Sequence, residues 1–300
     1  MAWLRGFIAK NYWRYSFSLQ NAVKSMLAVF AVLWLVTEIV AFFSSAVGAA
    51  IQAHWPSFLL VGFGWTLWEC RPRLSMKERV RGKDAFVEIC VGDCFESDGV
   101  CIIGSNTDFR TSGIDPASVQ AQFAHRFCGS PAGLDGLLTA SLADERPGLE
   151  TSDDDSGGRR VYPIGTVARV EAGGKEAYFV AIAELNEYGK AASSAAHIEL
   201  ALSKLWRYVA RRGGIGPLVV PVLGSGLSRI DRTRGDLIRT IILSFVAACA
   251  AGKFAERLTI VIHPRDFQTH DIDLEELRFF LKYACAYGEP RGPALTGHER

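Results

Sequence analysis

Residues 87–106 read VEICVGDCFESDGVCIIGSN. Two short apolar runs flank a polar link, and runs that are apolar on both faces are typical of buried strands in a parallel sheet. The first run ends in Gly92-Asp93. Ligands of open α/β sheets bind beyond the carboxyl ends of the strands, so Asp93 is placed to accept hydrogen bonds from a base or a ribose. A carboxylate there is equally typical of a turn that bonds its own backbone, and both interpretations stay open.

A second strand with a glycine-rich end lies at residues 219–230, which read VVPVLGSGLSRI. Glycines allow backbone N–H groups to approach a phosphate, and the start of the next helix favours negative charge. The motif lacks the Gly-Lys-Ser/Thr of a Walker loop and the G-x-S-x-G of a nucleophile elbow. It therefore indicates either phosphate binding or a plain turn.

The rest of the body alternates strand-like runs with amphipathic stretches, which predicts an α/β fold with a mixed, mainly parallel sheet sandwiched by helices. We expect a polar loop at residues 142–160. The predicted strands are residues 85–91, 100–103, 161–171, 176–183, 218–223 and 258–262, and the predicted helices are residues 114–127, 191–212, 231–251 and 274–286.

Charged and apolar residues are unevenly distributed along the chain. Residues 1–83 hold ten Lys/Arg against three Asp/Glu, and residues 84–300 hold 23 against 29. Residues 26–47 form an apolar run of 22 residues with one charge, which is enough to cross a bilayer. A weaker run follows at residues 46–68. Together they predict a transmembrane helical hairpin that turns near residues 44–56, with one span plus a re-entrant or interfacial segment as the alternative.

Flanking charges predict the orientation of this hairpin. Basic residues lie before the first run and at residues 71–83, whereas the connection between the runs has none, so we expect both termini in the cytoplasm of a multi-pass protein. Glu38 lies within the first run and is either protonated and bonded to a neighbouring helix or faces a pore or a partner helix. The expected domains are a hairpin at 1–70, a basic juxtamembrane linker at 71–83, a ligand-binding domain at 84–286 and a polar tail at 287–300.

Several classes of function are disfavoured. The seven cysteines form no CxxC pair and no spacing typical of zinc, so we expect free thiols and no metal. The body has no basic stripe with interleaved aromatic residues, so nucleic acid is not an expected partner. His125 and His197 lie in helical stretches without a partner acid fixed by spacing.

The two motifs together resemble a macro domain over roughly residues 84–286. The resemblance implies that Asp93, with the adjacent Cys94, binds the adenine of an ADP-ribose derivative. It implies that the glycine-rich loop wraps the diphosphate, and that Asn106 matches the second Asn of the family's Asn-Ala-Ala-Asn stretch. The first Asn, which hydrolytic members need, is replaced by Ile103, so we expect binding without catalysis and no cofactor. The diphosphate loop comprises Gly224, Ser225, Gly226, Leu227, Ser228 and Arg229, and the candidates for the distal ribose are Thr107, Asp108, Phe109 and Asn186.

The whole layout resembles the membrane-anchored macro effectors of type II Thoeris antiphage defence. That resemblance implies a messenger of the histidine-ADP-ribose class made by a TIR-domain partner, self-association, and disruption of the bacterial inner membrane that leads to cell death. The partners are then the nucleotide, the lipid bilayer and other copies of the chain. The alternatives are a membrane-tethered ADP-ribosyl hydrolase and a passive reader of ADP-ribosylated proteins.

Overall fold

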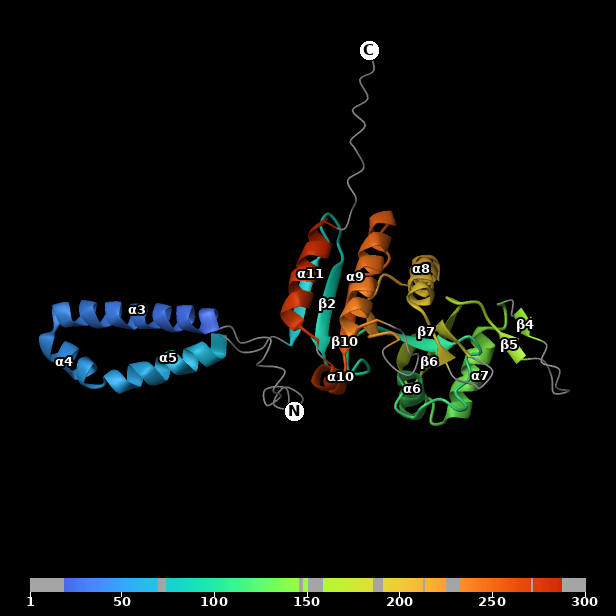
Figure 1. Cartoon of the computed structure of the whole chain (residues 1–300), viewed down its shortest axis with the longest axis horizontal. Coiled ribbons are helices and arrows are strands. Elements are labelled where there is room, and N and C mark those ends of the chain that lie inside the picture. Colours follow the sequence, from blue (N-terminus) through green and yellow to red (C-terminus); the bar gives the residue numbers. More distant parts are fainter. Residues whose placement is uncertain are drawn as a thin grey trace, which may run out of the picture. The chain divides into compact units, whose positions relative to one another are not determined.

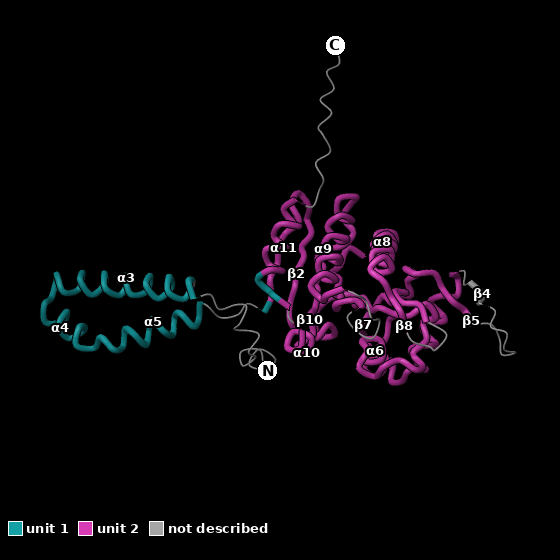
Figure 2. Tube along the Cα trace, in the orientation of Figure 1, with its two compact units in different colours: residues 1–74, 273–275 teal, residues 75–272, 276–300 magenta. Residues whose placement is uncertain are grey.

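The computed structural model describes residues 19–69, 74–145, 148–150, 159–185, 191–212, 214–224, 232–270 and 272–287. The chain divides into two compact units, which Figure 2 colours separately. One comprises Met1–Leu74 with Asp273–Glu275, and the other comprises Ser75–Ile272 with Glu276–Arg300. We call them the helical unit and the sheet unit.

The described residues 19–69 of the helical unit form three consecutive helices, α3 (Leu19–Phe43), α4 (Ser45–Ala53) and α5 (Trp55–Glu69), and α5 runs back beside α3 (Figure 1). Two glycines permit this packing. A Cβ on Gly62 would lie 3.2 Å from the Phe30 ring, and one on Gly48 would lie 2.5 Å from the Ala41 Cβ atom. The chain therefore returns as a hairpin, with α4 forming the connection instead of a tight turn.

One helix of this unit has the length and composition needed to cross a membrane. Residues Ala22–Phe43 of α3 form an apolar stretch of 22 residues whose side chains are mostly exposed. Helices α4 and α5 pass the same test only as a pair, and they are bent by 64° at the break between them. The bent pair is compatible both with a second, broken span and with a re-entrant segment.

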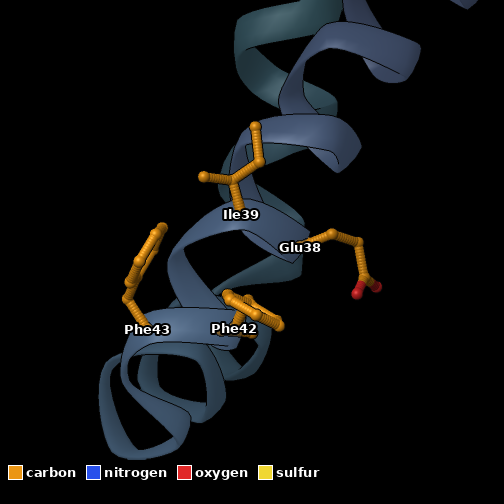
Figure 3. Close-up of a pocket in the computed structure, with 5 residues that line it drawn as sticks. Glu38, Ile39, Phe42 and Phe43 are labelled. Atoms are coloured by element: carbon orange, nitrogen blue, oxygen red, sulfur yellow. The ribbon is translucent and has the colours of Figure 1, made fainter.

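Glu38 points outward from α3, on the same stretch of helix as Ile39, Phe42 and Phe43 (Figure 3). Its side chain is exposed, and no side chain within the described residues bonds to it. A hydrogen bond to a neighbouring helix of the same chain is therefore absent from this part of the structure, whereas a contact with another molecule stays open.

The sheet unit is built on one large sheet with the strand order β1-β2-β10-β9-β3-β7-β6. The five inner strands are parallel, and both edge strands are antiparallel to their neighbours. The short strand β8 pairs with the end of β7. The strands are β1 (Ser75–Arg79), β2 (Phe86–Val91), β3 (Val100–Asn106), β6 (Val167–Ala172), β7 (Lys175–Leu185), β8 (Ala191–Ala192), β9 (Leu218–Pro221) and β10 (Arg257–Ile262).

Helices α6 (Val119–Phe127) and α7 (Pro131–Ser141) cover one face of the sheet. Their starts follow local chemistry, because the hydroxyls of Ser118 and Ser130 accept hydrogen bonds from backbone N–H groups of the first turn. Alternate residues of the strands point to this face. Phe123 packs on Phe179 of β7 with ring centroids 5.3 Å apart, at the centre of a buried apolar cluster.

Helices α8 (Ala195–Arg212), α9 (Arg234–Ala251) and α11 (Leu274–Tyr287) cover the opposite face (Figure 1). Trp206 of α8 contacts Phe245 of α9 with ring centroids 5.6 Å apart, and Tyr178 of β7 contacts Tyr208 of α8 at 5.8 Å. The short helix α10 (Pro264–Thr269) follows β10. The predicted α/β class, a mainly parallel sheet sandwiched by helices, is confirmed.

Several local predictions differ from the structure. The first helix of the body begins at Val119 rather than at residue 114, because Pro116 precedes the Ser118 cap and the intervening residues turn. Residues 75–79, assigned to the linker, form edge strand β1. Helix α7 and strands β4 (Gly148–Glu150) and β5 (Arg159–Val161), which pair with each other across the expected polar loop, carry too little apolar periodicity to be predicted.

Candidate functional site

The carboxyl ends of the five parallel strands lie along one edge of the sheet. Strand β2 leads into Gly92-Asp93, β10 into His263, β9 into Val222–Gly224 and β3 into Thr107–Phe109, and β7 ends at Leu185. The parallel pairing of these strands brings all of these ends together. The candidate residues come from positions far apart in the sequence, and the topology places them in one row.

At the β2 end of the row, Asp93 makes two strong hydrogen bonds. Its Oδ1 atom accepts from the Phe95 backbone N–H at 3.0 Å, and its Oδ2 atom accepts from Nη1 of Arg126 at 2.7 Å. Burial raises the pKa of Asp93, but the hydrogen bonds from Phe95 and Arg126 and the positive charge of Arg126 outweigh it, so the pKa lies below its usual value. Both the turn and an ionised carboxylate at the sheet edge are therefore present.

Arg126 is a site residue that the sequence analysis missed. It lies on α6, 33 positions from Asp93, and its guanidinium carbon is 5.0 Å from the centre of the Phe95 ring. A guanidinium presents a flat face and several donors, and its side chain here is 45% exposed. The one available signal was that Arg126 falls in the last turn of an expected helix, and this spacing does not identify a partner.

At the β3 end of the row, Asn106 has an unsatisfied acceptor. Its Nδ2 atom donates to the Arg110 carbonyl at 3.3 Å, whereas its buried Oδ1 atom has no hydrogen-bond donor within the described residues. The β3–β7 register shifts between Ser105 and Asn106, and such a bulge re-aims the side chain that follows it. A buried acceptor without a donor is costly, so a ligand hydroxyl that donates to it would be favoured.

The segment after Asn106 is tightly held. Thr107 donates its backbone N–H to the Ala183 carbonyl at 2.9 Å and accepts through its own carbonyl from the Tyr162 N–H at 2.9 Å. Thr107 and Asp108 are both buried. Further along, Asp135 of α7 accepts from the Thr111 N–H at 2.8 Å and also from the Thr111 hydroxyl.

Phe109 has a left-handed backbone, with φ of 56°, which is uncommon for a residue other than glycine. Its ring is buried and packs edge-on against Tyr162 with centroids 5.7 Å apart. A stacking contact of this ring with a ligand would require it to leave the core, whereas its backbone stays at the sheet edge.

The thiol of Cys94 also points into the core. Cys94 and Cys101 belong to the buried cluster beneath α6 and α7, and a hydrogen bond with Cys94, together with burial, raises the pKa of Cys101. Only the backbone of Cys94 is therefore near the edge. All six cysteines within the described residues are free thiols.

The structure describes only one of the residues predicted to form the diphosphate loop. Gly224 lies three residues after the end of β9 and has φ of +73°, a conformation in which glycine is preferred. Asn186, Ser225, Gly226, Leu227, Ser228 and Arg229 lie outside the described residues. Within the described ranges, no group of three or more His, Cys, Asp or Glu side chains is arranged to hold a metal ion.

Ile103 is completely buried in the cluster between β3 and helices α6 and α7. The position that carries the first Asn in the resembled stretch therefore offers no polar group to this edge.

Comparisons with known proteins found a matching family model and similar solved structures. Residues 87–263, more than half of the chain, match the family model described as Thoeris protein ThsA, macro domain. Two similar solved structures are the Oceanobacillus iheyensis macrodomain with MES bound (14% identity, TM-score 0.47, 69% of this chain and 97% of that chain covered) and with ADP (13%, 0.45, 68% and 96%). A third is the Trypanosoma brucei macrodomain in complex with ADP-ribose (7%, 0.41, 66% and 68%). No curated protein matches the chain.

The family model matches more than half of the chain, so the three-layer α/β unit is a macro domain. The extent of the family match then makes the assignment more specific: the chain belongs to the ThsA macro-domain family of Thoeris proteins.

Proposed function

We propose that this protein is a membrane-anchored receptor that binds an ADP-ribose-derived messenger at the carboxyl edge of its sheet. The messenger belongs to the histidine-ADP-ribose class and is made by a TIR-domain partner during phage infection. Binding drives self-association, and the apolar helices then disrupt the bacterial inner membrane. Both termini lie in the cytoplasm.

The order of the strand ends is the observation that carries this proposal. In space the row runs from Asp93 after β2, past β10, to Gly224 after β9, and then to Asn106 at the end of β3. ADP-ribose has the same order of parts, because its diphosphate joins the adenosine to the distal ribose. Neighbouring strands lie about 4.8 Å apart, so β2 and β9, which have β10 between them, are separated by roughly 10 Å.

Each position offers the chemistry that its part of the ligand requires. The ionised Asp93 can accept from the adenine amino group, since a carboxylate has acceptor capacity beyond its bonds to Phe95 and Arg126. The buried, unsatisfied acceptor of Asn106 suits the donor hydroxyl of a ribose. Backbone N–H groups after β9 suit the diphosphate.

Binding is favoured over hydrolysis because of the apolar environment at Ile103. The side chain is fully buried in an apolar cluster, and an Ile side chain can neither act as a general base nor orient a water molecule. His263 lies at the adenine end, where its Nδ1 atom accepts from the Arg265 N–H at 3.2 Å.

Self-association follows if the assembled state binds the messenger more tightly than the single chain does. Changing the populations from 1:99 to 99:1 requires about 5.5 kcal/mol of differential affinity. Anchoring through α3 assists assembly, because it confines the copies to two dimensions.

The test is a titration of the full-length protein in detergent with ADP-ribose and with its histidine conjugate. We expect binding without turnover, tighter for the conjugate, followed by an increase in oligomer mass and by dye release from proteoliposomes. Removal of residues 1–70 is expected to preserve binding and abolish dye release.

Three results would contradict the proposal in different ways. If neither ADP-ribose nor its histidine conjugate binds, the proposed site is wrong. Multiple-turnover release of a product makes the protein a hydrolase. Toxicity of the chain without residues 1–70 rejects the membrane mechanism.

A further inference from the structure

His263 lies within the carboxyl edge that the proposed function assigns to the nucleotide. It directly follows β10 and is the first residue before α10 (Figure 1). Strand β10 has β2 on one side and β9 on the other. The Gly92 N–H donates to the Ile262 carbonyl at 3.0 Å, so the next residues in the chain, Asp93 and His263, follow strand ends that are bonded to each other. His263 therefore lies between Asp93 and the segment after β9.

A hydrogen bond determines which nitrogen atom of the His263 ring carries the proton. The Nδ1 atom accepts from the Arg265 backbone N–H at 3.2 Å and so caps α10. A backbone N–H can only donate, so Nδ1 is unprotonated, and the single proton of the neutral imidazole is on Nε2. The ring is therefore a neutral hydrogen-bond donor at Nε2.

The Nε2 donor is available for a ligand. The His263 side chain is exposed, and the Arg265 N–H is its one hydrogen-bond partner among the described residues. The cap holds the ring in place, and α10 is itself anchored, because Phe267 is buried and donates its backbone N–H to the His263 carbonyl at 3.0 Å. A donor that is already oriented loses little conformational entropy when a ligand binds.

Capping alone does not explain an imidazole at this position. Ser, Thr, Asp and Asn are the preferred capping residues, and His is not among them. The chain uses these smaller side chains at three other helices, where Ser118 caps α6, Ser130 caps α7 and Thr233 caps α9. A serine at position 263 would accept the same backbone N–H, so the donor at Nε2 is what the ring adds.

We propose that Nε2 of His263 donates a hydrogen bond to a hydroxyl oxygen of the ribose that joins the adenine to the diphosphate. This ribose lies between the two in the nucleotide, and β10 lies between β2 and β9 in the sheet. A neutral donor suits a hydroxyl better than a phosphate, which is bound best by cationic donors or by clustered backbone N–H groups. The inference rests on the proposed function and adds to it a selection for ribonucleotides.

The test is a calorimetric titration of the full-length protein in detergent with ADP, 2′-deoxy-ADP and 3′-deoxy-ADP. We expect ADP to bind about fivefold more tightly than one of the two deoxy analogues, which corresponds to about 1 kcal/mol for one neutral hydrogen bond. In His263→Ser the side chain still caps α10, but the affinity for ADP should fall to that for the analogue. His270→Ser is the matched control, because His270 is exposed at the other end of α10, and this variant should keep the fivefold preference.

Three results would overturn the inference. Equal affinities of the unmodified protein for ADP and both analogues would show that neither hydroxyl is bound. A preference that persists in His263→Ser would assign the contact to another residue. An equal loss for all three nucleotides in His263→Ser would mean that the ring supports the edge of the sheet and does not contact the sugar.

ADP-ribose is titrated into the same preparations, so that failure of this inference is distinguished from failure of the proposed function. If the unmodified protein binds ADP-ribose but does not distinguish ADP from its analogues, this inference alone is wrong. If it binds neither ADP-ribose nor ADP, the proposed site is wrong as well.

Discussion

The two ends of the carboxyl edge differ in how completely their polar groups are satisfied. At the β2 end, both oxygen atoms of Asp93 already have donors, one from the backbone and one from Arg126. At the β3 end, the Asn106 Oδ1 atom is buried without a donor in the described part of the chain, next to the strained backbone of Phe109. The β2 end therefore presents a carboxylate whose hydrogen bonds are already made, and the β3 end has an amide oxygen without a hydrogen-bond donor among the described residues. From this difference we expect ADP-ribose affinity to depend most on Asp93, and discrimination between nucleotides to depend on Asn106.

The largest expected effect is at Asp93. Asp93→Ala in the full-length protein should weaken ADP-ribose binding by about 30-fold or more, because a charged hydrogen bond contributes roughly 2–3 kcal/mol. Isothermal titration calorimetry measures the change, and circular dichroism checks the fold. Asp98→Ala is the matched control, since Asp98 lies in the same link with its side chain 91% exposed. Equal affinities of the two variants would remove Asp93 from the site.

Asn106→Ala should weaken the binding of ADP-ribose but not that of ADP. We expect about a tenfold loss for ADP-ribose, equivalent to roughly 1.4 kcal/mol for one hydrogen bond. ADP lacks the distal ribose, so its affinity should stay unchanged. Parallel titrations with the two nucleotides provide the internal control. An equal loss for both would mean that Asn106 supports the fold of the edge and does not contact the distal ribose.

A smaller effect is expected at Asp135, which holds the segment after Asn106 through Thr111. Asp135→Ala should lower the free energy of unfolding by about 1–2 kcal/mol and reduce ADP-ribose affinity several-fold, with ADP little affected. Asp135→Asn keeps an acceptor and should restore most of the affinity. Denaturant titration and calorimetry measure the two quantities. Failure of the Asn variant to recover affinity would show that the charge, not the anchoring of the loop, is what matters.

The smallest effect concerns pH. The pKa of Asp93 is lowered in the folded protein, so its ionised form stabilises the fold above the unfolded pKa, and this contribution is lost as the pH falls through the folded pKa. Ligand binding that needs the carboxylate should be lost in the same direction. Arg126→Ala removes a hydrogen bond and a positive charge, so the acid limb of the affinity profile should move to higher pH. A limb at the same pH in both proteins would contradict the coupling between Arg126 and Asp93.

Local patterns were sufficient to predict most strands and helices of the body, because runs such as residues 176–183 and 258–262 are apolar on both faces and are bounded by turn residues. Edge strand β1 was not predictable in this way. Its exposure alternates between exposed and half-buried, and its residues are mainly polar, so only pairing with β2 defines it. The late start of α6 depends on the Ser118 cap, whose hydroxyl accepts a hydrogen bond from the Ala121 N–H.

The sequence by itself determined that an apolar helix precedes an α/β body, and that Asp93, Asn106 and Gly224 each follow a strand. These are local properties, set by hydrophobic runs and turn residues that are neighbours in the chain. Only the tertiary structure decided that β9 lies between β2 and β3 in space, that Arg126 meets Asp93, and that Asn106 keeps an open acceptor. Strand order and side-chain pairing join residues far apart in sequence, and no local pattern specifies which distant partners meet.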